Sequence, residues 1–153
     1  MKKQYVWIIV TCIWIGIIFS FSLQPGEISG DLSESFLIRI LAMFSPELLN
    51  KPEQMEILHT VLRKCAHFSE YFILGIFSSQ IFFQKGTKKR CLFGMFLSLA
   101  VAFVDESIQY FVPERAAKIL DVMLDGTGAL IGILMVVWIS YIYEKTIKKT
   151  SQP

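Results

Sequence analysis

Four long apolar stretches follow one another along the chain, separated by shorter polar segments. Each stretch is close to the roughly 20 residues that an α-helix needs to cross the hydrocarbon core of a bilayer. The pattern therefore predicts an all-α membrane protein, with four transmembrane helices in a single domain over residues 1–153. The predicted spans are approximately 5–23, 65–83, 91–112 and 119–143.

The segment between the first two spans has a helical pattern of its own. Asp31-Leu32-Ser33-Glu34 fits a helix start, with Asp31 as the cap. Pro46 is expected to end this helix, and Pro52 to begin another that continues without a break into the second span. The first of these helices carries one apolar stripe, so we expect an amphipathic interfacial helix on the outer surface or over the bundle. The stripe consists of Leu32, Phe36, Leu37, Ile40, Leu41 and Phe44.

The first apolar stretch has a second interpretation as a signal peptide. Lys2 and Lys3 precede it, and Ser20-Phe21-Ser22 resembles a cleavage site of small residues. Its apolar part is longer than usual for a signal peptide, and it contains Trp7 and Trp14. We therefore expect the stretch to be retained as a span.

Composition and charge agree with a membrane protein and fix its expected orientation. Of the 153 residues, 54% are hydrophobic, which excludes an ordinary soluble domain of this length. Basic residues gather in the loops that should face the cytoplasm, so both termini are expected there and residues 24–62 and 113–118 outside. These basic residues are short topology signals, and nucleic acid is not an expected partner. They are Lys2, Lys3, Lys85, Lys88, Lys89, Arg90, Lys145, Lys148 and Lys149.

The three cysteines are not expected to form a disulfide framework. Cys65 lies near the outer face of the predicted bundle and Cys91 near the inner face, so a bond between them would have to cross most of the bilayer. Cys12 lies within the first span. All three are predicted to be small packing residues.

Ionisable side chains occur at one end of three of the four spans. Such residues are costly in hydrocarbon and usually belong to a functional site. On a helix with a rise of about 1.5 Å per residue, Glu70 lies about 10 Å below Arg63. Glu106 lies about 9 Å below Val112, and Asp125 about 9 Å below Ile119. The predicted topology thus places carboxylates from three helices at one depth, in the outer half of the bilayer.

Glycine spacing indicates which face of the last span packs inward. Gly128 and Gly132 lie on the same stripe as Asp121 and Asp125. Small residues four apart let helix backbones approach closely in lipid. We therefore expect the aspartate-bearing face to point into the bundle.

These motifs, in this order, resemble the VanZ-like family, which is named for a teicoplanin-resistance protein. The resemblance covers nearly the whole chain and implies a small multi-span protein of the bacterial cytoplasmic membrane, associated with the cell envelope and with glycopeptide resistance. It implies no settled reaction. Asp125 departs from the family, which usually has Asn there, so no role is assigned to Asp125 alone. The matching segments are Ser20 to Pro25, Arg63-Lys64-x-Ala66-His67-Phe68-x-Glu70-Tyr71, Asp105-Glu106-x-x-Gln109, Pro113-x-Arg115, Asp121, Gly128 and Gly132.

One functional hypothesis is a hydrolase or transferase that acts on a lipid or lipid-linked envelope substrate from the outer leaflet. Histidine transfers protons or attacks as a nucleophile, carboxylates orient it or act as acids, and arginine binds phosphate in bidentate fashion. The candidate catalytic residues are His67, Glu70, Asp105, Glu106 and Asp121, and the candidate substrate-binding residues are Arg63, Lys64, Gln109 and Arg115.

Three alternatives stay open from the sequence. The site could bind or shield a lipid-linked precursor without chemistry, or the polar groups could form a purely structural network between helices. A metal is a third alternative, because His67 and Glu70 lie three residues apart on one helix and oxygen-rich ligation suits Mg, Mn or Ca better than Zn. His59 is expected at the surface, so no second histidine is in reach and no metal ligands are assigned. Cofactor and oligomeric state are left open.

Overall fold

The computed structural model describes residues 2–115 and 117–150, and all regular structure in these ranges is helical. Residue 116 of the predicted outer segment lies outside the described residues, as do the side chains of Lys2, Lys148 and Lys149 that served as topology signals. The helices are α1 (Lys2–Ser22), α2 (Gly26–Phe44), α3 (Pro52–Ile81), α4 (Thr87–Phe111) and α5 (Ile119–Thr150), with short 3₁₀ turns at Pro46–Asn50 and Phe83–Lys85.

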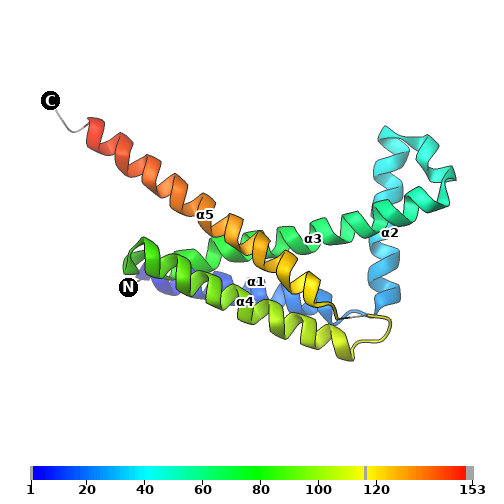
Figure 1. The fold of residues 1–153 in the computed structure, drawn as a ribbon, viewed down its shortest axis with the longest axis horizontal. Coiled ribbons are helices and arrows are strands. Elements are labelled where there is room, and N and C mark those ends of the chain that lie inside the picture. Colours follow the sequence, from blue (N-terminus) through cyan, green and yellow to red (C-terminus); the bar gives the residue numbers. More distant parts are fainter. Residues whose placement is uncertain (1, 116, 151–153) are drawn as a thin grey trace.

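The four long helices run side by side, and α3 is central among them (Figure 1). It packs against α1, α4 and α5, and its contact with α5 is the most extensive in the described chain. Helix α2 stands at one end of this bundle and runs across the direction of the other helices (Figure 1). The N-terminus and the end of α5 lie at the opposite end from α2 (Figure 1).

Three of the described helices are long and apolar enough to cross a membrane: Lys3–Ser22, Thr87–Phe111 and Ile119–Ile147. Helix α3 is not among them. Its first half is polar and includes Arg63 and Lys64, and its second half is apolar except for His67 and Glu70 near its start. The structure thus confirms an all-helical membrane-type protein with three apolar spanning helices.

The core and the outer faces of the bundle are both apolar. Large hydrophobic side chains such as Ile9, Phe96 and Leu134 are exposed on the outer faces. Soluble monomers rarely expose so much apolar surface, whereas a lipid environment covers it. The buried core consists of Ile18, Tyr71, Leu74, Val101, Ala102 and Ala129, which come from all four long helices.

The glycine stripe of α5 lies against α3, as predicted. A side chain at Gly128 would meet the carbonyl oxygen of Phe68, and one at Gly132 would meet that of Phe72. Only glycine leaves room for two backbones this close. The stripe therefore fixes the aspartate face of α5 toward the interior of the bundle.

The start of α2 corrects one prediction. The helix begins at Gly26, not after Asp31, because a contact from outside the helix organises its first turn. The Gly26 N–H donates to the Pro113 carbonyl at 3.1 Å, and the Ser29 N–H donates to that of Pro25 at 3.1 Å. The predicted break before Pro46 and the unbroken helix from Pro52 are confirmed.

The apolar stripe of α2 is only partly covered by protein. Leu37 and Leu41 are buried, while Leu32, Phe36 and Phe44 are exposed. The Ser33 hydroxyl is hydrogen-bonded to Nε2 of His59, which ties α2 to α3. His59 is thus partly exposed, as expected of a residue near the surface, while its ring contacts α2.

Candidate functional site

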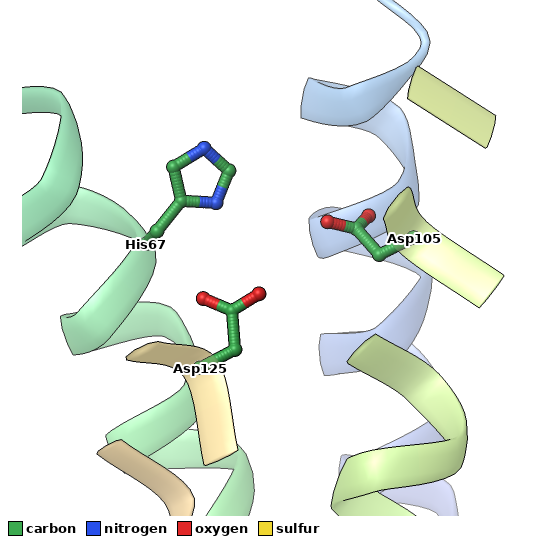
Figure 2. A group of neighbouring side chains, drawn as sticks. All are labelled: His67, Asp105 and Asp125. Atoms are coloured by element: carbon green, nitrogen blue, oxygen red, sulfur yellow. The ribbon is translucent and has the colours of Figure 1, made fainter. Parts of the chain in front are cut away.

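Three long helices each bring one metal- or proton-binding side chain to a common point. His67 comes from α3, Asp105 from α4 and Asp125 from α5. One nitrogen or oxygen of each lies within 4.8 Å of the corresponding atoms of the other two. Figure 2 shows the imidazole and the two carboxylates directed toward the space between them. Both aspartates are fully buried and His67 is half-buried.

The other predicted acidic residues surround this point. Glu70 lies near Asp105, and Glu106 lies near both Asp105 and Asp121. Glu106 Oε2 accepts a hydrogen bond of 2.8 Å from the backbone N–H of Lys118. Asp121 Oδ1 is 3.6 Å from Nζ of Lys64. The structure thus brings all five predicted catalytic residues together, and it adds Asp125.

Several buried polar atoms in and beside this cluster have no hydrogen-bond partner among the described residues. Such buried and unpaired groups are rare in folded proteins, and each one calls for an explanation. The Lys64–Asp121 ion pair is longer than a hydrogen bond, so Asp121 Oδ1 is counted with them. The atoms are His67 Nδ1, the Tyr71 hydroxyl, Asp105 Oδ1, Glu106 Oε1, Asp121 Oδ1 and both carboxylate oxygens of Asp125.

Two residues predicted to bind substrate also form hydrogen bonds within the protein. Gln109 is buried, and its Nε2 donates to Ser22 Oγ at 3.2 Å and to Asp105 Oδ2 at 3.1 Å. It joins α4 to the end of α1 and fixes the orientation of Asp105. Gln109 also lines the cavity described below, so its prediction as a substrate-binding residue stays a prediction.

Arg115 similarly anchors the end of α1. Its Nε donates to the Gln24 carbonyl at 3.3 Å and its Nη2 to the Phe21 carbonyl at 3.0 Å. Burial lowers the pKa of its guanidinium, and the nearby positive charge of Arg63 acts in the same direction. Two guanidinium groups in proximity repel each other, so this region is favourable for an anion.

A basic cavity of about 280 Å³ lies over the cluster. Arg63 forms no hydrogen bond or ion pair with any described residue, so its guanidinium is available to a ligand. His67 and Asp121 also line the cavity. The cavity therefore joins an anion-attracting wall to the imidazole–carboxylate cluster. The basic residues that line it are Arg63, Lys64, Arg115 and Lys118.

An apolar groove of about 550 Å³ meets this cavity. It lies between the end of α1, helix α2 and helix α3, and Arg63, His67 and Arg115 line both the groove and the cavity. Its apolar walls include the exposed residues Leu32 and Phe36 of α2. A polar pocket and an apolar groove thus share one boundary, at the unpaired histidine.

Asp125 is the site residue that the sequence interpretation set aside. Its departure from the family pattern argued against a role, yet it is fully buried beside His67 and Asp105. The signal that could have found it was its spacing of four residues from Asp121, on the face that carries Gly128.

A second buried polar group lies at the other end of α4. Arg90 was interpreted as a loop charge, but α4 begins at Thr87 and Arg90 is only 7% exposed. Its Nε donates to the Ser79 carbonyl at 3.1 Å, Nη1 to Ser140 Oγ at 3.2 Å and Nη2 to Gln80 Oε1 at 3.2 Å. Arg90 therefore joins α3, α4 and α5.

Comparison with models of known protein families shows which family the chain belongs to. Residues 7–140 match the model of the VanZ/LLP1 family. The chain belongs to this family. The resemblance inferred from the ordered motifs is thus confirmed, and the matched range includes every candidate site residue. Searches of curated proteins and of solved structures found no match.

Proposed function

We propose that this VanZ/LLP1 protein acts on a phosphate-bearing lipid or lipid-linked cell-envelope precursor at the outer leaflet of the bacterial cytoplasmic membrane. The chemistry is hydrolysis or group transfer at the phosphate. In this proposal the chain crosses the membrane four times, both termini are cytoplasmic, and α2 lies along the outer surface.

The topology is supported by the packing and direction of the helices. Helix α3 contacts all three of the long apolar helices, and its apolar half runs beside them, which supports a fourth crossing. Helix α2 runs across the bundle direction, as an interfacial helix does (Figure 1). Lys88 and Lys89 lie at the end of the bundle away from α2, as the positive-inside rule requires for the cytoplasmic side.

The observation that carries the proposal is the shared boundary between the basic cavity and the apolar groove. A phosphate fits a wall formed by Arg63, Lys64 and Lys118, because these side chains supply positive charge and N–H donors. An acyl or polyprenyl chain fits the groove beside Leu32 and Phe36, where contact with apolar surface is favourable. In this proposal the phosphate of such an amphiphile would lie next to His67, which lines both the cavity and the groove.

The cluster below the phosphate has groups suited to move protons. An attacking O–H, from water in hydrolysis or from an alcohol in transfer, forms a new P–O bond and gives its proton to His67 or to a neighbouring carboxylate. The P–O bond to the leaving oxygen breaks, and that oxygen takes up the proton that the histidine or carboxylate has accepted. General acid–base catalysis of this kind contributes about 10² to 10⁴-fold in rate.

The experiment that tests the proposal is a lipid inventory of the host membrane by mass spectrometry, with and without the protein. We expect one phosphate-bearing lipid species to fall and a product to rise when the wild-type protein is present. His67→Ala and Glu70→Gln should abolish this change at equal membrane abundance. A teicoplanin susceptibility assay on the same strains shows whether the altered lipid accounts for resistance.

The variants separate this proposal from its alternatives. If no lipid species changes but Arg63→Ala still abolishes resistance and lipid retention, the protein is a binder and not an enzyme. If every variant merely lowers the amount of folded protein, the polar groups form a structural network. Glu144→Gln, at the exposed far end of α5, is the matched control that should leave lipid conversion unchanged.

A further inference from the structure

The cluster of His67, Asp105 and Asp125 contains buried polar atoms without hydrogen-bond partners among the described residues. Asp125 is fully buried, yet neither of its carboxylate oxygens has a hydrogen-bond partner among the described residues. The unpaired Asp105 Oδ1 and His67 Nδ1 belong to the same cluster. Unpaired buried carboxylates are strongly unfavourable, because burial removes the water that would otherwise stabilise them.

The charge of the whole cluster adds to this imbalance. Five carboxylates from three helices lie near one another. Among the described residues only Asp121 forms an ion pair, with Lys64, while the charge of Arg115 acts on Glu70, Asp105 and Glu106 from a greater distance. Repulsion among these groups in a low-dielectric interior must be relieved, either by protons or by a bound cation. The carboxylates are Glu70, Asp105, Glu106, Asp121 and Asp125.

Geometry favours the cation. A shared proton joins only two of these groups, whereas one cation can contact an atom of each of the three residues, and the free oxygens and nitrogen that it needs are present. Two ligands on opposite sides of an ion with bonds of about 2.1 Å are about 4.2 Å apart. The three ligand atoms lie within 4.8 Å of one another and surround one space (Figure 2). Small side-chain movements therefore suffice to close them on an ion.

We infer that His67, Asp105 and Asp125 bind a divalent cation of the Mg²⁺ or Mn²⁺ class. Two carboxylates and one imidazole suit these ions, which prefer oxygen ligands and keep several positions for water or substrate phosphate. His67 also lines the basic cavity, so an ion has a route from the outer surface. Gln109, which donates to Asp105 Oδ2, holds that ligand in place.

This inference rests on the proposed function and names its cofactor. An ion bound to His67 would lie beside the boundary of cavity and groove, because His67 lines both, and there it could polarise a phosphoryl oxygen or lower the pKa of an attacking water. His67 would then be a ligand and not a base. The proton of the attacking water would pass to Asp121 or Glu106, whose free oxygens lie beside the site.

The test is a titration of the purified full-length protein, in nanodiscs and without substrate, with MnCl₂ followed by electron paramagnetic resonance. We expect one saturable Mn²⁺ per chain. Asp125→Asn keeps the shape of the side chain and removes its charge, and it should weaken binding about tenfold or more. Asp105→Asn should do the same, and Glu144→Gln on the same helix as Asp125 should bind as the wild type does.

Size-exclusion profiles and helical circular dichroism show whether each variant is folded. If a variant is unfolded, the titration of the wild-type protein alone still decides the inference. Absence of saturable Mn²⁺ binding to the wild type would overturn the inference. The inference would also be overturned if folded Asp105→Asn and Asp125→Asn bound Mn²⁺ as tightly as the wild type does.

Failure of the inference and failure of the proposed function give different results. If Mn²⁺ binds as expected but no lipid changes in the inventory, the site exists and the proposed chemistry is wrong. If lipid conversion by the purified protein persists in EDTA and no Mn²⁺ binds, the chemistry stands and the cation is wrong.

Discussion

The bundle contains two buried polar clusters, and they differ in how completely their atoms are paired. Around Arg90, three guanidinium nitrogens each donate to an oxygen of α3 or α5. Around Asp125, many polar atoms have no hydrogen-bond partner among the described residues. The two clusters are about 22 Å apart along α4, as the helical rise from Arg90 to Asp105 gives. Both clusters connect the same three helices.

This difference separates a structural role from a functional one. Paired polar groups hold helices together, and each contact contributes about 0.6 to 2 kcal/mol in a membrane. Unpaired groups cost free energy, and proteins keep them where a ligand or reaction needs them. We therefore assign helix packing to the Arg90 cluster and propose that the Asp125 cluster carries the function. Four substitutions test this contrast.

The largest loss of stability is expected at the contact between α3 and α5, because both clusters depend on it. Gly132→Leu would force a side chain against the Phe72 carbonyl and push α5 away from α3. We expect it to destabilise the protein by about 3 kcal/mol or more, because backbone cannot yield as a side chain can. Thermal unfolding in detergent measures this. Gly16→Leu in α1 is the control, since no atom lies near a side chain there, and equal loss in both variants would refute the contact.

In the Asp125 cluster, we expect a large loss of activity without a loss of stability. Asp105→Asn retains an oxygen acceptor for Gln109 and removes the charge. Lipid conversion per folded chain should fall about 10²-fold or more, because a group that acts in the reaction is lost. Unfolding should stay within about 1 kcal/mol of the wild type. A variant that unfolds easily but converts lipid normally would reverse the roles of the two clusters.

In the Arg90 cluster, the expected result is the opposite. Arg90→Gln removes most of the donors that join α3 and α5, so stability should fall by about 2 kcal/mol for three lost contacts. Lipid conversion per folded chain should be unchanged. The two readouts are taken on the same purified samples, and a drop in specific activity equal to that of Asp105→Asn would contradict the contrast.

The smallest expected effect is a gain in stability rather than a loss. Asp125→Asn relieves repulsion among neighbouring carboxylates, so the ion-free protein should become more stable by about 1 kcal/mol while lipid conversion falls. Unfolding measured in EDTA removes any contribution of a bound cation. A clear loss of stability under these conditions would mean that Asp125 has a structural partner.

Much of the fold followed from sequence because helical periodicity and spanning length are local properties. The stripe with Gly128 correctly predicted that Asp125 faces the interior, and Pro46 and Pro52 correctly predicted where one helix ends and the next begins. The membership in the VanZ/LLP1 family and the convergence of His67 with Asp105 also follow from ordered motifs and a common depth.

The remaining features depend on contacts between distant segments. The start of α2 is set by Pro113, which is distant in sequence, and Arg115 is bound to carbonyls at the end of α1. Arg90 looks like a topology charge until its partners on α3 and α5 are known. Spacing along one helix shows which residues share a face, but only packing shows what that face meets.

The most direct test of the account is to measure the phosphate-bearing lipid that stays bound to the purified protein. Arg63→Ala and Arg90→Gln each remove one arginine, one beside the unpaired cluster and one in the paired cluster. The account predicts that Arg63→Ala loses this lipid while folded Arg90→Gln retains the wild-type amount. Equal retention by Arg63→Ala, or equal loss in both, would contradict the assignment of function to the cluster around His67 and Asp125.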